Sequence, residues 1–385
     1  MKRHLYNDDH EAFRGVVREF VRREVVDNIQ RWEDQGRVDR DVWTAAAKQG
    51  IIGLFAPVEY GGAGQGRDFR FRNVVIEELT RVHASSLQSN LSLQDDLAIP
   101  YVMELGTDEQ KKRWLPGLAS GELLAAIAMT EPGTGSDLRG IATKGTKVDG
   151  GWIVNGSKTF ITNGIQSDLV IAVVRTDPEG GSRAFSLLVV ERDMPGFSRG
   201  RKLAKLGLHG QDTAELSFDD VFVPDENVLG GVGDGFGRLI HYLPLERLSI
   251  AAAAVGAATA IFSDTLAYAN AREIFGKPIA DFQNSRFVLA DIAIELDVAR
   301  AFLDQSIRAY NDGDLSVVDA AKLKVAASEM SNRVVDRCLQ MHGGYGYMME
   351  YPVARAYADL RIQRIYGGAS EVLRDLIGRD LVGRR

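Results

Sequence analysis

A glutamate beside an arginine is the residue pair in this chain best suited to acid–base chemistry. Glu246 and Arg247 lie between Pro244 and Leu248, directly before an alanine-rich stretch with helical spacing. A buried glutamate can have a pKa near neutrality and can then remove a weakly acidic proton. The same pair also fits a structural role, as a charge and its ion-pair partner at the start of a helix. The residues alone leave both interpretations open.

Two loops carry glycines and hydroxyl groups that could contact an anion or the edge of a ring. Residues 128–137 combine two glycines with three hydroxyl side chains, so that backbone N–H groups can approach a ligand closely. Residues 156–164 place an aromatic face next to a threonine hydroxyl. Taken singly, the first also fits a plain connecting loop and the second the edge of a hairpin.

The composition argues against several other kinds of site. The net charge of -7 does not favour a nucleic-acid partner. The single cysteine, Cys338, cannot form an internal disulfide and has apolar neighbours, which fits a buried structural thiol in a reducing compartment. His342 has no second ligand at suitable spacing, so we expect no metal site.

Neither a signal peptide nor membrane insertion is predicted. The basic residues after Met1 are followed by a polar segment where a signal peptide would need an apolar one. The most apolar run, Ile250 to Phe262, is mostly alanine and too short to span a bilayer. We expect it to form a helix that packs closely against other helices through its small residues.

The elements that must position these residues change type twice along the chain. The first third is helical, with an apolar stripe from Phe13 to Val21, and Thr107 is expected to cap a helix. Short β-rich runs separated by turn signals then extend to about residue 224. Helical periodicity returns near residue 235, and long helices are expected over 246–272, 287–311 and 317–340.

The predicted fold class is mainly α with a central antiparallel β-domain. We expect an N-terminal helical domain over residues 1–121, a β-barrel or sandwich over residues 122–230 and a C-terminal four-helix bundle over residues 231–385. Strands and helices do not alternate, which argues against a doubly wound sheet.

With the two loops, several further motifs in order resemble the acyl-CoA dehydrogenase family over nearly the whole chain. They are residues 205–221, 271–283, 340–347 and 366–368. Much of the family carries its catalytic glutamate in the last of these, the tail turn, where this chain has Gly367. A glutamate at position 246 instead resembles the long-chain and isovaleryl branch.

The resemblance implies FAD-dependent α,β-dehydrogenation of an acyl-CoA thioester. Glu246 would remove the α proton while a hydride leaves the β carbon for flavin N5. The thioester oxygen would be held by a flavin hydroxyl and the Gly367 N–H, donors worth about 3–4 kcal/mol each. Leu245, Arg247 and Gly368 would also border the substrate. Burial should raise the pKa of Glu246, while Arg247 and the helix N-terminus should oppose that rise.

The flavin site implied by the family draws on distant parts of the chain. Met129 and Thr130 would line one side of the ring, and Phe160, Ile161 and Thr162 its other edge, with Thr162 near N5. The adenine and phosphate end would be bound across a subunit boundary by Arg272, Phe275, Gln283, Gln340, Gly343 and Gly344. The remaining predicted cofactor contacts are Gly135, Ser136, Phe282, Met341, His342, Ala369, Ser370 and Glu371.

The resemblance also implies substrate contacts and partners. Ser136 would meet the pyrophosphate or the thioester, and Ser182 and Arg183 fall where isovaleryl enzymes contact substrate; Arg183 binds a CoA phosphate or stays solvated. The shared cofactor implies at least a dimer, and the family is usually tetrameric. Electrons would pass to an electron-transfer flavoprotein, in a bacterial cytoplasm or, for a processed eukaryotic chain, in the mitochondrial matrix.

Two departures from the family pattern affect the site. Ala369 replaces a common threonine, so one flavin contact would be missing. Asp95 and Asp96 lie where the family's acyl cavity is usually more apolar. Because buried carboxylates without partners are costly, we expect both to face solvent; the alternative is a polar pocket floor and a short or functionalised acyl group. Gly367, in contrast, should free room for a longer or branched chain.

Other functions remain open at this stage. A flavin oxidase or an acyl-carrier-protein dehydrogenase would share the fold. A non-catalytic helical interaction protein would also fit the helical ends, but it would not bind FAD.

Overall fold

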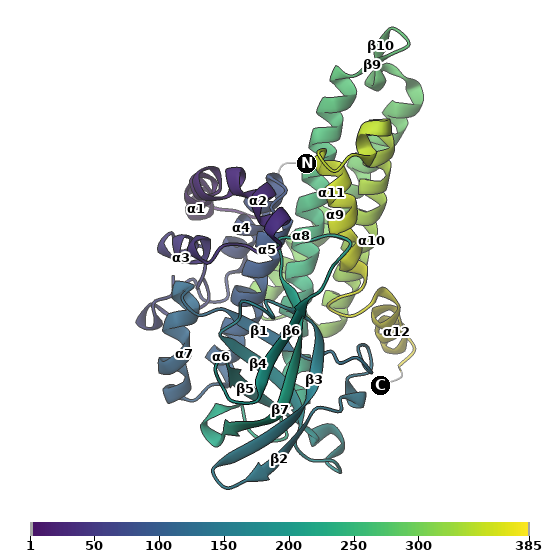
Figure 1. The fold of residues 1–385 in the computed structure, drawn as a ribbon. Coiled ribbons are helices and arrows are strands. Elements are labelled where there is room, and N and C mark those ends of the chain that lie inside the picture. The colour runs from purple at the N-terminus through teal and green to yellow at the C-terminus, as the bar shows by residue number, and fades with distance from the viewer. Residues whose placement is uncertain (1–2, 384–385) are drawn as a thin grey trace.

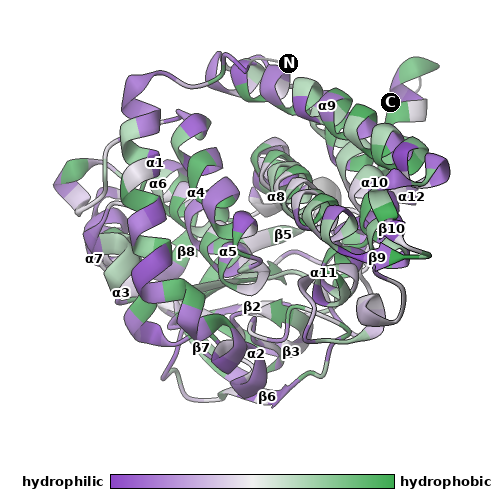
Figure 2. Cartoon of the chain, turned by 90° about the horizontal axis from the view of Figure 1, so that it is seen from above, coloured by the Kyte–Doolittle hydropathy of each residue, from purple (hydrophilic) through white to green (hydrophobic). Residues whose placement is uncertain are grey.

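A computed structural model describes residues 3–383 and arranges them as N-terminal helices, a β-domain and long C-terminal helices (Figure 1). The predicted class, mainly α with a central β-domain between helical parts, is confirmed. The longest helix, α8 (Gly235–Ala271), lies in the middle of the molecule when viewed along its axis (Figure 2). Helices α4 and α5 pack on one side of it and α9 and α10 on the other.

The N-terminal part consists of short amphipathic helices. In α1 the predicted stripe is confirmed in part, because Val17, Phe20 and Val21 are buried whereas Val16 is 40% exposed. Thr107 caps α7 as predicted: its side chain accepts from the Gln110 N–H, and the Gln110 side chain accepts from the Thr107 N–H. The helices are α1 (Asp8–Phe20), α2 (Ile29–Gln35), α3 (Arg40–Lys48), α4 (Phe69–Arg81), α5 (Ser85–Ser92), α6 (Ile99–Leu105) and α7 (Asp108–Ser120).

The β-domain is a mixed sheet. Its main path has the strand order β6-β7-β3-β2-β4-β5-β8, and most neighbours run antiparallel as predicted. The exceptions are β1, which pairs in parallel with β4, and a single parallel contact between β2 and β4. The strands are β1 (Ala125–Ala128), β2 (Lys144–Val148), β3 (Gly151–Thr162), β4 (Leu169–Arg175), β5 (Phe185–Glu191), β6 (Phe197–Lys202), β7 (Thr213–Pro224) and β8 (Val228–Leu229).

Strand β4 joins two hydrophobic cores because its side chains alternate between two faces. Leu169, Ile171 and Val173 belong to the cluster formed with the N-terminal helices. Val170 and Val174 point the other way, into the interior of the β-domain. Residues buried on both faces explain why this strand reads as a continuous apolar run.

The C-terminal part contains three long helices and two shorter ones. They are α8, α9 (Gln283–Asn311), α10 (Val317–His342), α11 (Pro352–Arg361) and α12 (Ser370–Leu381). A small hairpin, β9 (Glu273–Ile274) and β10 (Lys277–Pro278), joins α8 to α9 at the far end of the bundle (Figure 1). The predicted ranges of the second and third long helices agree with α9 and α10 to within four residues.

The predicted start of the first long helix is wrong. Helix α8 begins at Gly235, eleven residues before Glu246, and continues through Pro244. A proline inside a helix removes one hydrogen bond and costs about 3 kcal/mol, so it normally marks a boundary. Here the surrounding helix packs tightly, with Leu245 and Leu248 both in the bundle core.

One helix among residues 3–383, spanning Gly237–Ala271, is long and apolar enough to cross a membrane by length and composition alone. Its most apolar window is 61% buried inside the protein, which is typical of a core helix. The small residues predicted to permit close packing do so: Gly256, for example, lies so close to Thr80 of α4 that a Cβ would collide with its hydroxyl.

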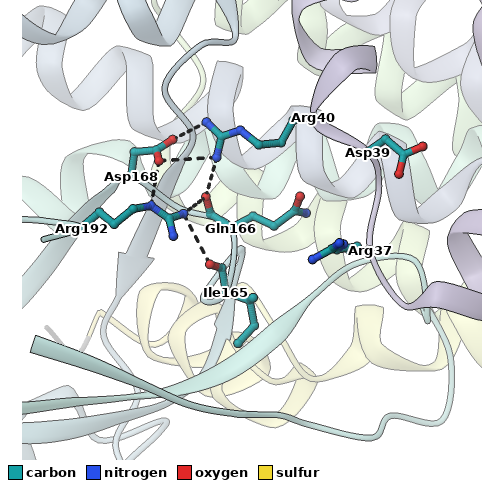
Figure 3. A pocket seen from close by; sticks show the side chains of 7 residues that line it. All are labelled: Arg37, Asp39, Arg40, Ile165, Gln166, Asp168 and Arg192. Atoms are coloured by element: carbon teal, nitrogen blue, oxygen red, sulfur yellow. Dashed lines mark hydrogen bonds and ion pairs between the residues drawn. The ribbon is translucent and has the colours of Figure 1, made fainter.

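An ion-pair cluster ties the N-terminal helices to the β-domain (Figure 3). Arg40, at the start of α3, and Arg192, after β5, both bind Asp168, at 2.6 and 2.9 Å. A cavity of about 380 Å³ lies beside this cluster, and Arg37 and Gln166 also line it. It contains none of the residues predicted to bind substrate or cofactor.

Candidate active site

Glu246 lies three turns inside α8, partly exposed and next to the tail turn. Burial raises the pKa of its carboxyl group, while the charges of Arg247 and Lys324 oppose that rise. The expected contribution of the helix N-terminus is wrong, because dipole effects are confined to the first turn. The pKa of Glu246 is therefore raised, because the effect of burial outweighs the opposing effect of the two cations. Such an environment suits a base.

The tail turn brings Gly367 against Glu246. A Cβ built on Gly367 would lie 3.6 Å from Glu246 Oε1 and would collide with Ile250 Cδ1. Gly367 and Gly368 have φ values of 61° and 92°, which favour glycine. The space expected to become free at Gly367 is therefore occupied by Ile250.

Two buried cations accompany the carboxylate. Arg247 is 5% exposed and donates to the Val317 carbonyl at 3.1 Å; burial lowers its pKa. Lys324, on α10, is fully buried and donates to the Gly368 carbonyl at 2.8 Å. Tyr101 and Tyr366 complete the surroundings, since burial and then the Glu246 charge raise the pKa of both hydroxyls.

Asp95 and Asp96 do not face solvent, contrary to expectation, because both have partners. Arg72 Nε binds Asp96 Oδ1 at 2.8 Å, and Ser249 Oγ donates to Asp96 Oδ2 at 2.5 Å. Asp95 Oδ1 accepts from two backbone N–H groups, those of residues 53 and 54. Burial raises the pKa of Asp95 to about 7, although Arg72 opposes the rise.

Both aspartates lie on the π-helical segment Leu93–Ala98 between α5 and α6, and Asp96 joins this segment to α4 and α8. A narrow crevice of about 10 Å³ runs nearby, lined in part by Ala253 and Ala257 of α8 and by Tyr366. Neither Asp95 nor Asp96 lines it. The cluster is thus a buried polar link between helices, beside the region of Glu246.

The two predicted flavin loops come together in the β-domain. Lys158, within β3, is fully buried and donates to the carbonyl of Met129 at 3.1 Å and to Glu131 at 2.9 Å. The Thr159 N–H donates to the carbonyl of Thr130. Burial lowers the pKa of Lys158 to about 8, although the Glu131 carboxylate opposes this shift. This ion pair fixes the ends of β1 and β3 side by side.

The side chains predicted at this flavin wall differ in exposure. Phe160 is 69% exposed and has a φ of 60°, whereas Ile161 is buried and Thr162 is intermediate. Gly135 and Ser136 lie in the exposed loop after β1. Phe160 thus presents an aromatic face, as expected from the sequence, and that face is exposed.

A second group of predicted cofactor residues lies at the far end of the bundle. Phe275 is 94% exposed on the β9–β10 hairpin and contacts Phe282 edge-on. The Arg272 guanidinium lies 5.8 Å from the centre of the Tyr345 ring, which connects the hairpin to the end of α10. Other members of the group are Gln283, Gln340, Met341, Gly343 and Gly344, all intermediate or exposed.

His342 is the buried exception in this group. Its ring stacks on Tyr268 at 4.3 Å between centroids, and its Nδ1 is hydrogen-bonded to the Cys338 carbonyl. Cys338 is buried, as predicted for a structural thiol, and burial raises its pKa to about 11. Among residues 3–383 no group of three or more potential metal ligands is found.

The remaining predicted residues are dispersed. Arg183 is exposed in the turn before β5, near the start of α8, and Ser182 lies in the same turn. Leu245 points into the bundle core. Ser370 is buried and donates to Glu329 at 2.8 Å, while Ala369 precedes it at the start of α12 and Glu371 is exposed.

Sequence reasoning missed Lys324 and Arg72. Lys324 falls on the same helical face as Ala320, Ala327 and Ser331, all buried in α10. A lysine on an otherwise small and apolar stripe is the signal that could have identified it. Arg72 falls among buried residues of α4 in the same way.

Comparison with known proteins gives matches to one family over nearly the whole chain. Family models for the N-terminal, middle and C-terminal domains of acyl-CoA dehydrogenases match residues 7–122, 126–221 and 233–382. The mitochondrial long-chain specific acyl-CoA dehydrogenase of Sus scrofa is 43% identical over 99% of this chain and 88% of its own length.

Solved structures are similar over their whole length. An acyl-CoA dehydrogenase from Geobacillus kaustophilus has a TM-score of 0.95 and 43% identity, covering 98% of each chain. A glutaryl-CoA dehydrogenase from Mycobacterium smegmatis, solved in complex with FADH2, has a TM-score of 0.92 and 27% identity, covering 99% of this chain and 96% of its own. The chain therefore belongs to the acyl-CoA dehydrogenase family of oxidoreductases.

Proposed function

We propose that Glu246 is the base that removes the α proton of an acyl-CoA thioester. The observation that supports this most directly is the approach of its carboxylate to Gly367, where Oε1 lies 3.6 Å from the position of a Cβ. The site thus has one carboxylate beside a turn that offers a backbone N–H. Burial raises the pKa of Glu246, which makes it a stronger base once ionised.

The tail turn would stabilise the charge that develops on the thioester oxygen. The Gly367 N–H is the proposed donor, and a preorganised donor of this kind contributes about 3–4 kcal/mol to transition-state stabilisation. Arg247 and Lys324 add positive charge around the same turn. Gly368, with Leu245 and Arg247, remains part of the proposed substrate site.

The residues present fit FAD. Phe160, 69% exposed, offers a flat apolar surface beside the loop of Met129 and Thr130. Ile161, Thr162, Gly135 and Ser136 would extend that wall as predicted. When bound, FAD would supply the acceptor for the hydride that leaves the β carbon. Thr162 is the proposed neighbour of the reactive ring edge.

The cofactor site is proposed to be shared between subunits. Roughly 38 Å of helix separates Glu246 from Ala271 at 1.5 Å per residue. Arg272 and Phe275 therefore lie far from Glu246 of their own chain, at the other end of α8 (Figure 1). A second chain would supply these two residues, together with Phe282, Gln283, Gln340, Met341, His342, Gly343 and Gly344. Ala369, Ser370 and Glu371 follow the tail turn beside Glu246, so they would contact FAD from the same chain as Glu246.

The acyl chain is proposed to extend along α8. Ile250, Ala253 and Ala257 follow Glu246 at four, seven and eleven residues, which places them on one helical face. The last two line the crevice beside Tyr366. Ser136, Ser182 and Arg183 are the proposed contacts for the CoA part.

An electron-transfer flavoprotein is the proposed electron acceptor. The relatives include a mitochondrial enzyme and bacterial ones, which supports the matrix or a bacterial cytoplasm as the compartment. No nucleic-acid partner is proposed for a chain of net charge -7.

The test is anaerobic titration of the FAD-loaded protein with acyl-CoAs of graded length and branching, followed by flavin absorbance. Wild type should lose its flavin absorbance with at least one acyl-CoA. Glu246→Gln should keep FAD and bind the same ligand, but reduce its flavin about 10²–10⁴-fold more slowly. Glu179→Gln, an exposed loop residue, is the matched control and should behave as wild type.

The outcomes separate the alternative functions. Reaction with carrier-bound acyl groups only would indicate an acyl-carrier-protein dehydrogenase, and stoichiometric peroxide in air would indicate an oxidase. A Glu246→Gln variant as fast as wild type would refute the proposed base.

A further inference from the structure

Lys324 is a buried cation in direct contact with the tail turn. It lies on α10 and is fully buried, and its Nζ donates to the Gly368 carbonyl at 2.8 Å. Gly368 directly follows Gly367, the proposed donor to the thioester oxygen. The lysine therefore holds one end of the peptide segment whose other end must point at the substrate.

A lysine at this place is costly for the fold. Burial of an ammonium group without a strong partner destabilises its charged form. Lys324 has one close acceptor here, a neutral carbonyl, on a helix face otherwise made of small and apolar residues. A methionine of similar length would fill the same volume without this cost, so packing alone does not explain the lysine.

Four charged groups act on Lys324, and two of them belong to the proposed site. Glu246 and Arg247 face it from α8, Glu329 lies on its own helix, and Glu371 lies on α12. Glu329 is already paired with Arg364 at 2.9 Å and Arg374 at 3.2 Å, and Glu371 is 80% exposed and screened by solvent. Glu246 is thus the carboxylate that Lys324 chiefly balances.

We propose that Lys324 is a positioning residue for the dehydrogenation, which holds the Gly367–Gly368 turn through the Gly368 carbonyl and keeps Glu246 ionised. The turn needs such support because both glycines have positive φ values and are free to adopt other conformations. This inference rests on the proposed function of Glu246. In addition, it names the contact that would keep the tail turn ordered. It also names a charge that would influence the pH range in which Glu246 is ionised.

The test compares Lys324→Met and Lys324→Arg in the FAD-loaded protein by rapid-mixing flavin reduction and steady-state kinetics, over a range of acyl-CoA concentrations and of pH. Lys324→Met should reduce flavin about 10- to 100-fold more slowly, because a displaced donor loses part of its 10²–10³-fold effect. Its KM should change much less than its kcat. Loss of the cation should also raise the pKa of Glu246, so the acid limb of kcat/KM should move to higher pH.

Lys324→Arg keeps the charge but not the geometry of the contact. It should therefore be slow like Lys324→Met and yet keep the acid limb near its wild-type pH. Lys322→Met is the matched control: Lys322 is a partly exposed lysine of the same helix, paired with Asp319 at 3.0 Å, and its replacement should change neither readout.

A Lys324→Met variant with the wild-type rate and an unmoved acid limb would overturn the proposal. Equal loss of bound FAD and of cooperative unfolding in both Lys324 variants would overturn it as well, because it would assign the residue to fold stability. Failure of the wild type to reduce flavin with any acyl-CoA would instead count against the proposed function itself.

Discussion

Two effects of opposite sign act on the pKa of Glu246. Burial raises the pKa of its carboxyl group and Arg247 and Lys324 lower it, and the net direction is upward. A proton-transfer base is most effective when its pKa approaches the working pH, whereas an unopposed buried glutamate would stay protonated. The two cations thus oppose the effect of burial and favour the ionised form of the proposed base.

This balance predicts the pH dependence of catalysis. Because the base must be unprotonated, kcat/KM should rise with pH through the pKa of Glu246 in the free enzyme. That midpoint should lie above the ordinary glutamate value, since burial outweighs the cations. Steady-state kinetics over acid to neutral buffers measures it, and a midpoint at or below the ordinary value would contradict the raised pKa.

At the level of single residues, the sequence identified groups that act locally and missed those whose partners are distant. Phe160 was predicted to offer an aromatic face to a ligand, and its side chain is 69% exposed. Asp96 was expected in solvent because its partner Arg72 lies 24 residues away and Ser249 lies 153 residues away. Burial of a charge depends on such partners, and spacing along a chain does not reveal them.

At the scale of elements, α8 is the helix along which the proposed acyl chain would extend. Its face after Glu246 carries Ile250, whose side chain fills the space next to Gly367. Beyond it, Ala253 and Ala257 leave a narrow crevice beside Tyr366. Small side chains on this face would permit a long acyl chain to lie along the helix, provided that the crevice widens when it binds.

Ala253→Val should therefore discriminate against long acyl chains. The added methyl groups enter the crevice, and one extra carbon in an apolar pocket changes specificity by about 10–200-fold. We expect kcat/KM to fall at least about tenfold for long-chain acyl-CoA and little for short-chain acyl-CoA, measured with a graded series. Ala267→Val, exposed on the same helix, is the control. Equal loss for all chain lengths would place the acyl group elsewhere.

Element types were easier to predict than their limits and directions. Thr107 caps its helix as predicted because the capping signal is local. The start of α8 was misplaced because Pro244 is tolerated inside a tightly packed helix, a tertiary effect. The parallel pairing of β1 with β4 was missed because apolar alternation reports burial and carries no information on strand direction.

For the whole molecule, the predicted flavin residues fall into two groups that one chain cannot bring together. The group near Phe160 lies in the β-domain, and the group near Phe275 lies at the opposite end of the bundle (Figure 1). Helix α9 also exposes an apolar stripe of Phe287, Ile294 and Val298, which are 59%, 62% and 66% exposed. Such an exposed apolar stripe on a helix is typical of a contact with another subunit.

Ile294→Glu should therefore disrupt assembly and, with it, cofactor binding. A charge in the middle of a buried apolar contact is costly, so the variant should dissociate into smaller species. Because the proposed FAD site takes its second group from a neighbouring chain, the variant should also lose FAD on dilution. Light scattering after size exclusion and flavin absorbance per chain measure the two effects. Val58→Glu, the same kind of change at a 74% exposed N-terminal position, should alter neither. A dissociated Ile294→Glu variant that still retained full FAD would show that each chain binds its cofactor alone.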